Sequence, residues 1–335
     1  MALAIEVDKR KAEEVKNVLL EMDLLDDSRK IKRRGAKVEI PVKEIPPIDI
    51  NYELIEEDGY IKRKRFVPFE EIKRILRNEI SCEDFEKLPH KWEKFGDVLI
   101  LKMEGIKEKE KVAEGYARVL KCKSVLEDVG GIKGKERKPI FRFLYGKDAE
   151  TIHVENGIKY KFDASQIMFS SGNIDERIRM GEVVKGGVAV DMFAGIGYFT
   201  LPMAVYGKAE VYACEINPIS YSYLKENILL NDVANRVKPL LGDCREVAPH
   251  GIADRVVMGY FDSIPFFPYA LRCIKEDGVI HFHIKCSEDN FPDKIFKKVK
   301  RIAKDNGWEV EMLFHKKIKS YAPRIIHGVI DIYVS

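Results

Sequence analysis

The sequence predicts an α/β protein whose C-terminal half folds as a doubly wound sheet. Residues 188–190 are an apolar strand that runs into Asp191 and a glycine turn, and residues 199–203 continue as a helix. A second strand, residues 211–215, follows the helix and ends in the carboxylate of Glu215. In doubly wound sheets, this order of strand, glycine turn, helix and acid-tipped strand holds the ribose and base of a nucleotide.

The glycine turn itself indicates which nucleotide is bound. Gly195 and Gly197 have no side chain, so a ligand can lie against the backbone there. The spacing DxFxGxG…E lacks the third glycine of a GxGxxG fingerprint, and this favours S-adenosylmethionine over a dinucleotide. Gly242, Asp243 and Cys244 follow a third strand and strengthen this interpretation. The alternative is a structural turn of an unrelated α/β domain.

Four polar side chains near this turn can be given roles. The carboxylate of Glu215 can accept two hydrogen bonds from a ribose diol, and Asp243 stands where such folds hold the adenine amino group. Ser170 can hydrogen-bond a ligand, and Arg177 can pair with a ligand carboxylate through two parallel bonds. The alternatives are surface acids at strand ends and a capped helix with a solvated arginine.

Composition places the chain among soluble globular proteins of two or three domains. Of its 335 residues, 45% are hydrophobic and 34% are charged, and 58 basic side chains nearly balance 55 acidic ones. The six cysteines show no CxxC or zinc spacing, so we expect reduced thiols and no bound metal. A leader sequence and an apolar stretch of about 18 residues are both missing, so we expect a cytoplasmic protein.

We expect three domains. Residues 1–60 are a small βαβ-like module that ends in a proline-containing linker, 61–165 are an α+β domain, and 166–335 are the nucleotide-binding sheet. The expected helices before the sheet are 11–21, 70–78 and 107–119, and the expected strands outside its glycine-turn region are 2–7, 37–42, 96–101, 124–127, 140–145, 151–155, 278–283 and 329–334. The last two strands are expected to pair as an antiparallel closing hairpin. Asn156-Gly157 predicts a further hairpin turn.

Clusters of basic residues occur in each of the three domains. Residues 29–34 hold five cations in six positions, a second run covers 62–65, and a helix at 293–306 carries six cations along one side. Each run can be a solvated surface, but clusters in three domains together favour one long polyanion. The candidate RNA-contacting residues are Arg33, Arg34, Lys62, Arg63, Lys64, Arg65, Lys135, Arg137, Lys138, Tyr260, Tyr321 and Arg324.

The end of the fourth strand, residues 255–260, argues against methylation of a nitrogen. Enzymes that methylate amino groups place Asn or Asp there, followed by two prolines and an aromatic residue, and the side-chain amide grips the nitrogen. Met258 stands at this point, followed by Gly259 and Tyr260, and a thioether offers no such grip.

A pair of histidines on the next strand is a second possible chemical feature. His281 and His283 flank Phe282 and therefore point to one face of the sheet. A zinc site would need a third ligand at suitable spacing, and the sequence offers none. Histidines satisfied within a core or cleft are the preferred interpretation.

Six segments of the sequence together carry a family resemblance. They are ENGIKYKFD (155–163), FSSGNIDER (169–177), DMFAGIGYF (191–199), EINP (215–218), GDCRE (242–246) and KSYAPR (319–324). The chain resembles the archaeal tRNA guanine-N1 methyltransferases and their sister family, the aminocarboxypropyltransferases of wyosine biosynthesis. Its strand-four end RVVMGY, its short KPIF segment and its ending IHGVID are similar to the transferases. The methyltransferases instead have Asn-Pro-type strand ends and a catalytic arginine in the segment that corresponds to residues 137–141.

The resemblance implies a class I S-adenosylmethionine-dependent, Rossmann-like sheet behind an RNA-contacting domain. It implies a monomeric enzyme that transfers the 3-amino-3-carboxypropyl group of S-adenosylmethionine to C7 of 4-demethylwyosine in tRNA-Phe and releases methylthioadenosine. The cofactor-binding positions are then Ser170, Arg177, Asp191, Phe193, Ala194, Gly195, Gly197, Glu215, Ile216, Asp243, Cys244 and Met258. Candidates for a general base are Glu176 and His283. The alternatives are a guanine-N1 methyltransferase acting on the same nucleotide and a noncatalytic tRNA-binding protein.

Overall fold

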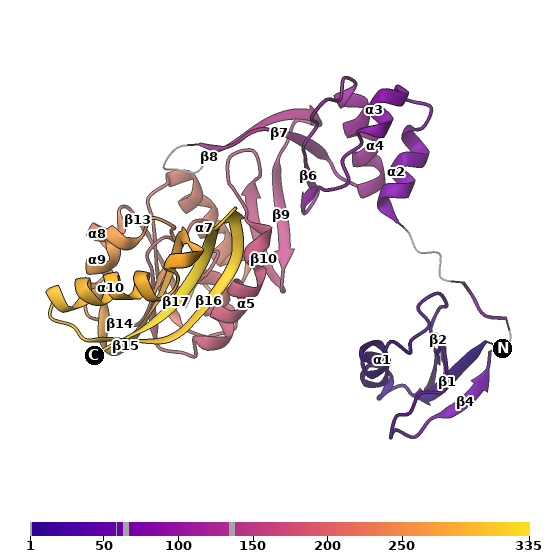
Figure 1. Ribbon diagram of the computed structural model, residues 1–335, viewed down its shortest axis with the longest axis horizontal. Helices are drawn as coiled ribbons and strands as arrows, with labels where there is room; N and C mark the ends of the chain where they lie inside the picture. Colours follow the sequence, from indigo (N-terminus) through magenta and orange to yellow (C-terminus); the bar gives the residue numbers. More distant parts are fainter. Residues whose placement is uncertain (1, 58, 63–66, 134–137) are drawn as a thin grey trace. The chain divides into compact units, whose positions relative to one another are not determined.

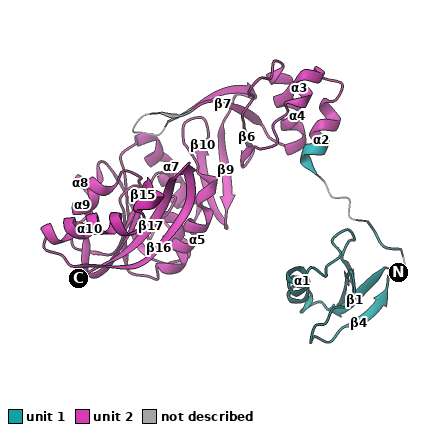
Figure 2. Ribbon diagram, viewed as in Figure 1, with its two compact units in different colours: residues 1–71 teal, residues 72–335 magenta. Residues whose placement is uncertain are grey.

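The computed structural model describes residues 2–57, 59–62, 67–133 and 138–335 (Figure 1). The chain forms two compact units, Met1–Glu71 and Ile72–Ser335 (Figure 2). The larger unit contains both the α+β elements and the nucleotide-binding sheet. The division into three domains at residues 60 and 165 stays a prediction.

The smaller unit is an antiparallel sheet covered by one helix. Its elements are β1 (Leu3–Asp8), α1 (Ala12–Glu21), β2 (Lys32–Arg34), β3 (Lys37–Pro41) and β4 (Glu53–Glu56), with the strand order β2-β3-β1-β4. Val15 and Leu19 of α1 pack on Ile5 and Ile40 of the sheet. The expected βαβ-like arrangement is wrong, because Gly35 (φ +60°) reverses the chain between β2 and β3 and leaves β3 antiparallel to β1.

The α+β part of the chain contains every helix and strand expected there, together with two short elements that were not expected. Its helices are α2 (Pro68–Leu76), α3 (Cys82–Glu86) and α4 (Lys109–Leu120), and its strands are β5 (Glu93–Phe95), β6 (Val98–Leu101), β7 (Ser124–Lys133) and β8 (Lys138–Tyr145), in the order β5-β6-β7-β8. The unexpected elements, α3 and β5, are too short to give a periodic pattern in the sequence.

A hairpin connects this part of the chain to the main sheet. β9 (Glu150–Glu155) and β10 (Ile158–Asp163) are joined by Asn156 and Gly157, whose φ angles are +47° and +76°. Asn and Gly tolerate positive φ, so the predicted turn is confirmed. Tyr160 and Phe162 of β10 pack into the same core as the main sheet. The hairpin therefore packs with the nucleotide-binding sheet.

The main sheet is mixed and has the strand order β13-β12-β11-β14-β15-β17-β16. Its parallel strands are β11 (Val188–Asp191), β12 (Glu210–Glu215), β13 (Val237–Leu241), β14 (Ala253–Met258) and β15 (Ile274–Ser287), and its antiparallel strands are β16 (Val310–Ala322) and β17 (Ile325–Val334). The predicted antiparallel pairing of the closing strands holds for β15 and β17. However, the hairpin partner of β17 is β16, an edge strand that was not expected, and residues 316–322 of the basic C-terminal segment lie on it.

Helices cover both faces of this sheet, as the doubly wound class requires. One face carries α5 (Ile174–Val183), α6 (Thr200–Val205) and α7 (Pro218–Leu230), and the other carries α8 (Cys244–Val247), α9 (Phe267–Cys273) and α10 (Asp293–Asp305). The adjacent residues Ala189 and Val190 of β11 point into the two different cores. The predicted fold class is confirmed.

One cation of the first basic run is buried in the smaller unit. The Arg29 guanidinium bonds Asp26 Oδ2 at 2.7 Å and Glu57 Oε2 at 3.0 Å, and it also donates to the carbonyls of Leu3 and Val42. Both Arg29 and Glu57 are buried. This arginine is therefore a structural part of the unit; Lys32 also pairs with Glu57 at 2.8 Å, and Lys30, Arg33 and Arg34 are exposed.

We expect Arg29→Met to destabilise the smaller unit by about 3 kcal/mol, because the buried Glu57 carboxylate loses its arginine and, among the described residues, keeps only Lys32, 2.8 Å away, as an ion-pair partner. Amide hydrogen exchange on peptides that cover β1 and β3 measures this change. The control is Arg10→Met, which breaks only the exposed pair with Asp8 and should leave exchange nearly unchanged. Equal protection in both variants would contradict a structural role for Arg29.

Candidate active site

The glycine turn after β11 lies at the edge where the parallel strands end. Gly195 (φ +57°) and Gly197 (φ +103°) have backbone angles that favour glycine, and a Cβ at Gly195 would lie 2.6 Å from the Tyr198 ring. Ala194 is buried and donates its N–H to the Cys214 carbonyl at 2.9 Å. The turn is thus fixed against the neighbouring strand β12. A side chain at Gly195 or Gly197 would collide with Tyr198 or Leu201, so the turn needs both glycines.

Asp191 holds this turn from inside. Its carboxylate accepts hydrogen bonds from the Thr200 hydroxyl at 2.8 Å and from the Phe193 N–H at 3.3 Å. Burial raises the pKa of Asp191 to about 6. The fully buried side chain shapes the turn, and its predicted contact with the cofactor stays a prediction.

Glu215 joins the turn to the next loop. Its carboxylate accepts the Gly195 N–H and the Asn217 N–H, both at 2.7 Å, and burial raises its pKa. A carboxylate has about four lone-pair sites, so acceptor capacity remains for a ribose diol. The next side chain, Ile216, is 64% exposed, and Leu241 at the end of β13 is 49% exposed. Together these residues make an edge with one carboxylate between two exposed apolar side chains.

Asp243 and Cys244 begin helix α8. Asp243 accepts the Arg245 N–H at 2.9 Å as the helix N-cap, and its pair with the Arg245 side chain at 2.5 Å lowers the pKa of its carboxyl. Cys244 is buried, and burial raises the pKa of its thiol to about 12. Only its backbone amide is therefore suited to contact a ligand.

Met258 is one of the predicted cofactor contacts. Its side chain is fully buried in the core that also contains Phe267 and Phe282, so it does not reach the ligand edge. Beyond it the wall is aromatic: the Phe193 and Tyr260 rings lie 5.3 Å apart with their planes tilted by 32°. At this strand end no side-chain amide is available to hold a ring nitrogen.

Arg177 was predicted to pair with a ligand carboxylate, and in the structure it pairs with a carboxylate of the protein. Its guanidinium is buried and bonds both oxygens of Glu155, at 2.5 and 2.7 Å, and the Ser170 carbonyl at 3.0 Å. The arginine is neither solvated nor open to a cofactor carboxylate. The Ser170 hydroxyl instead accepts a hydrogen bond from Lys319 of β16 at 2.7 Å. Glu155 and Lys319 both lie in segments that carry the family resemblance. The sequence does not indicate that Glu155 contacts Arg177 or that Lys319 contacts Ser170.

The two candidate bases are buried as well. Glu176 is fully buried and bonds Arg179 through both oxygens, at 2.6 and 2.9 Å. His283 lies 3.0 Å from His327 through its Nδ1, and burial lowers its pKa to about 3. Neither group is exposed in this arrangement, and the role of general base stays a prediction for both. His281 is likewise buried, with its Nδ1 2.7 Å from Asp331.

The candidate RNA-contacting residues are distributed over both units, and each unit is described by itself. Arg33, Arg34 and Lys62 are exposed, and Arg34 pairs with Glu39 at 2.6 Å. Tyr321 is half exposed and Arg324 is exposed; the Tyr321 ring packs edge-on against Phe261. The structure does not describe residues 63–65, 135 and 137, nor the side chain of Lys138, so these assignments stay predictions.

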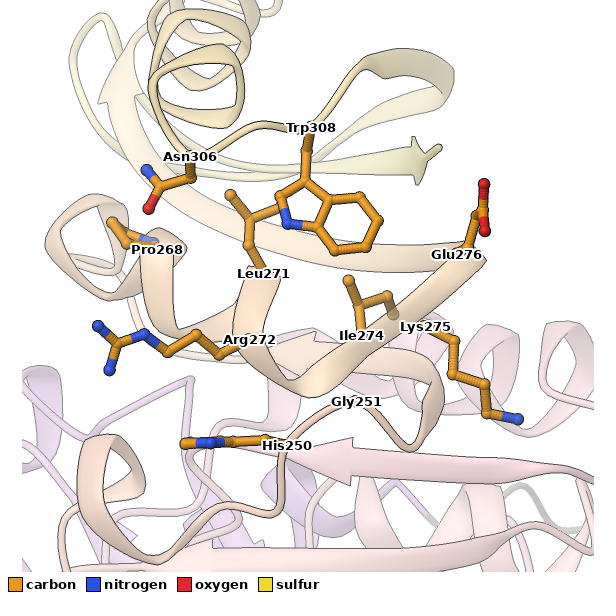
Figure 3. A pocket seen from close by; sticks show the side chains of 10 residues that line it. All are labelled: His250, Gly251, Pro268, Leu271, Arg272, Ile274, Lys275, Glu276, Asn306 and Trp308. Carbon is orange, nitrogen blue, oxygen red and sulfur yellow. The ribbon is translucent and has the colours of Figure 1, made fainter.

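One hollow of the larger unit lies away from this edge (Figure 3). Of its lining residues, His250 precedes β14, Arg272 lies near the end of α9, Lys275 lies at the start of β15, and Trp308 follows α10. It is therefore at the amino ends of the strands, opposite the glycine turn. Within the described residues, no three His, Cys, Asp or Glu side chains are grouped as a metal site requires, and none of the helices is long and apolar enough to span a membrane.

Comparison with known families identifies each part of the chain. Residues 151–311 match the TRM5/TYW2 methyltransferase domain, and residues 72–149 match the TYW2 N-terminal domain. Residues 4–50 match the tRNA methyltransferase 5 N-terminal domain. The chain therefore joins an N-terminal module typical of one sister family to a central domain typical of the other.

Individual relatives also come from these two sister families. The tRNA(Phe) (4-demethylwyosine(37)-C(7)) aminocarboxypropyltransferase of Pyrococcus horikoshii is 46% identical over 267 residues, which cover 78% of this chain and 96% of the relative. The tRNA (guanine(37)-N(1))-methyltransferase Trm5b of Pyrococcus abyssi is 34% identical and covers 100% of both chains. The crystal structure of P. horikoshii TYW2 in complex with MeSAdo superposes with a TM-score of 0.73 at 43% identity, over 80% of this chain and 99% of that one.

The buried Asp191 carboxyl makes a testable contribution to stability. Its folded pKa of about 6 lies above the ordinary value of 3.8, so its contribution is full below about pH 4 and falls as the pH rises through 6. We expect the unfolding free energy of Asp191→Asn, relative to wild type, to rise by about 2 kcal/mol between pH 4 and pH 7. Urea unfolding followed by the fluorescence of Trp92 and Trp308 measures this. A difference independent of pH would contradict the raised pKa.

Proposed function

Because the chain belongs to the TRM5/TYW2 family, we propose that it is a tRNA-modifying transferase that uses S-adenosylmethionine as co-substrate. It transfers the 3-amino-3-carboxypropyl group to C7 of 4-demethylwyosine, next to the anticodon of tRNA-Phe. The new bond joins C7 to the carbon beside the sulfonium, the carbon–sulfur bond breaks with its electron pair staying on sulfur, and C7 loses its proton. Methylthioadenosine is the leaving group.

The residues at the end of β14 are the observation that favours transfer to a carbon over methylation of a guanine nitrogen. Met258 points into the core and is followed by Gly259 and Tyr260, so the strand-end position itself has no amide or carboxylate to hold a guanine nitrogen. A carbon nucleophile on a flat tricyclic base needs no such hydrogen bond. The aromatic wall of Phe193 and Tyr260 offers a stacking surface for the base or the adenine instead.

The edge around Glu215 fits S-adenosylmethionine. Glu215 would accept the ribose hydroxyls with the lone pairs that Gly195 and Asn217 leave open. Ile216 and Leu241 would cover the two faces of the adenine, and the bare Gly195 backbone would accommodate the rest of the ligand. By holding the co-substrate in one orientation, these residues select which of the three carbons on sulfur meets the base.

Guanine-N1 methylation remains the second candidate, because the Trm5b relative covers the whole length of this chain, including its N-terminal unit. The partner in either case is the anticodon region of a tRNA. We propose further that the enzyme acts as a monomer in the cytoplasm. Contacts from both units would allow one chain to hold the RNA without a second copy.

The reaction can be tested with S-adenosylmethionine labelled separately on its methyl and its carboxyl carbon. We expect the carboxyl label to enter tRNA-Phe that bears 4-demethylwyosine, with methylthioadenosine as co-product. The methyl label should stay out of tRNA that carries unmodified guanosine. Methyl transfer to that guanosine, with release of S-adenosylhomocysteine, would replace the proposal by the methyltransferase.

Glu215→Ala should weaken S-adenosylmethionine binding about 10- to 100-fold, because each lost charge-assisted hydrogen bond is worth about 1.5–3 kcal/mol. Calorimetric titration measures the affinity. Glu210→Ala is the matched control: the same substitution at the start of the same strand removes only an exposed pair with Lys238. Wild-type affinity in a folded Glu215→Ala protein would contradict the ribose-binding role.

A further inference from the structure

Helix α10 has one buried face and one strongly basic face. Val299 and Ala303 are buried in the core beneath α9, and Ile295, Phe296 and Ile302 pack against the same core. The remaining positions are exposed and carry a basic stripe that consists of Lys294, Lys297, Lys298, Lys300, Arg301 and Lys304. The helix is thus held to the sheet by one side. The other side presents six cations to solvent.

The basic stripe lacks the counter-charges that other exposed lysines of the same unit have. Lys87 pairs with Glu83, Lys238 with Glu210 and Lys275 with Asp254, all within 2.9 Å. In the stripe, Lys294 bonds only the neutral Asn290 side chain at 3.1 Å. The other five members have no ion pair within the described part of the chain. The stripe is therefore a solvent-exposed face whose positive charge is not compensated by ion pairs among the described residues.

The spacing of the stripe adds repulsion within the helix. Lys297, Arg301 and Lys304 follow one another at intervals of four and three residues, so their side chains lie on one line. Like charges at these intervals destabilise a helix, and a bound polyanion relieves the repulsion. At 1.5 Å per residue the helix is about 20 Å long, which is enough to follow several phosphates of one strand.

The basic stripe also begins at the edge of the sheet that holds the glycine turn. β15 is parallel to β14, so it ends at the edge that holds the glycine turn, and α10 follows after a short turn at Glu288–Asn290 (Figure 1). The stripe therefore starts near the site edge and runs along the face of the sheet opposite α5 and α7. A nucleic-acid stem that enters the site can extend along this helix.

We propose that the exposed face of α10 binds the phosphate backbone of the tRNA stem that carries the substrate base. This inference rests on the proposed function for the identity of the RNA. The contacts are to phosphates, so they add affinity and orientation without reading sequence. Each neutralised phosphate releases counterions, and binding then depends on salt in proportion to the number of contacts.

The test is the triple variant Lys297→Glu, Arg301→Glu and Lys304→Glu. With an unmodified tRNA-Phe transcript and no co-substrate, we expect Kd to rise at least tenfold at physiological salt. The slope of log affinity against log salt should fall by about 2, as expected for up to three lost contacts at 0.7–0.9 each. The corresponding Gln variant should lose the same slope without added repulsion.

The matched control replaces three other exposed lysines by glutamate, namely Lys185, Lys208 and Lys225. It should leave the Kd and the salt slope within twofold of the wild-type values. Far-ultraviolet circular dichroism and S-adenosylmethionine affinity confirm that both triple variants fold. An unchanged slope in the α10 variant, or loss of binding to anionic phospholipid vesicles with tRNA binding intact, would overturn the inference. Because the assay needs no turnover, a failure of the labelled transfer reaction would count against the proposed function alone.

Discussion

The binding edge depends on one partly buried carboxylate, Glu215, which connects two loops. The Gly195 amide belongs to the loop after β11, and the Asn217 amide belongs to the loop after β12. Hydrogen bonds from amides to an ionised carboxylate are strong, and here they offset the burial that disfavours its charge. The two loops are therefore held in one relative geometry by a side chain that still has lone pairs for a ligand.

Asp191 and Glu215 also give this edge its charge. In the described part of the chain neither carboxylate has an ion pair, and the hydrogen bonds to both come from backbone amides and the Thr200 hydroxyl. The charge of Glu215 even contributes to the raised pKa of Asp191. An edge with uncompensated negative charge suits a ligand that carries a positive sulfonium. The same arrangement would disfavour a dinucleotide, whose pyrophosphate is anionic.

Local sequence patterns predicted the parts of the site that are local in the chain. The strand, glycine turn and acid between Val188 and Glu215 form one continuous unit whose elements follow the predicted order. Arg177 could not be predicted in this way, because its partner Glu155 lies 22 residues earlier on a hairpin that packs against α5 only in the folded protein. Arg29 likewise looks like one cation in a basic run until Glu57 is placed beside it. Hydrophobic periodicity carries no information on such distant ion pairs.

The ends of β12 and β14 differ, and this difference explains how the sheet can support transfer to a carbon instead of methylation of a nitrogen. At β12 a carboxylate faces the ligand, whereas at β14 the corresponding side chain, Met258, is withdrawn into the core. The loop after β14 is nevertheless fixed, because the Ser263 hydroxyl donates to the His283 carbonyl at 2.9 Å. A rigid loop without a polar grip can orient a flat base by packing but cannot hold a nitrogen in place. In the proposed reaction, selectivity for a carbon nucleophile would then follow from the orientation of the base and the co-substrate.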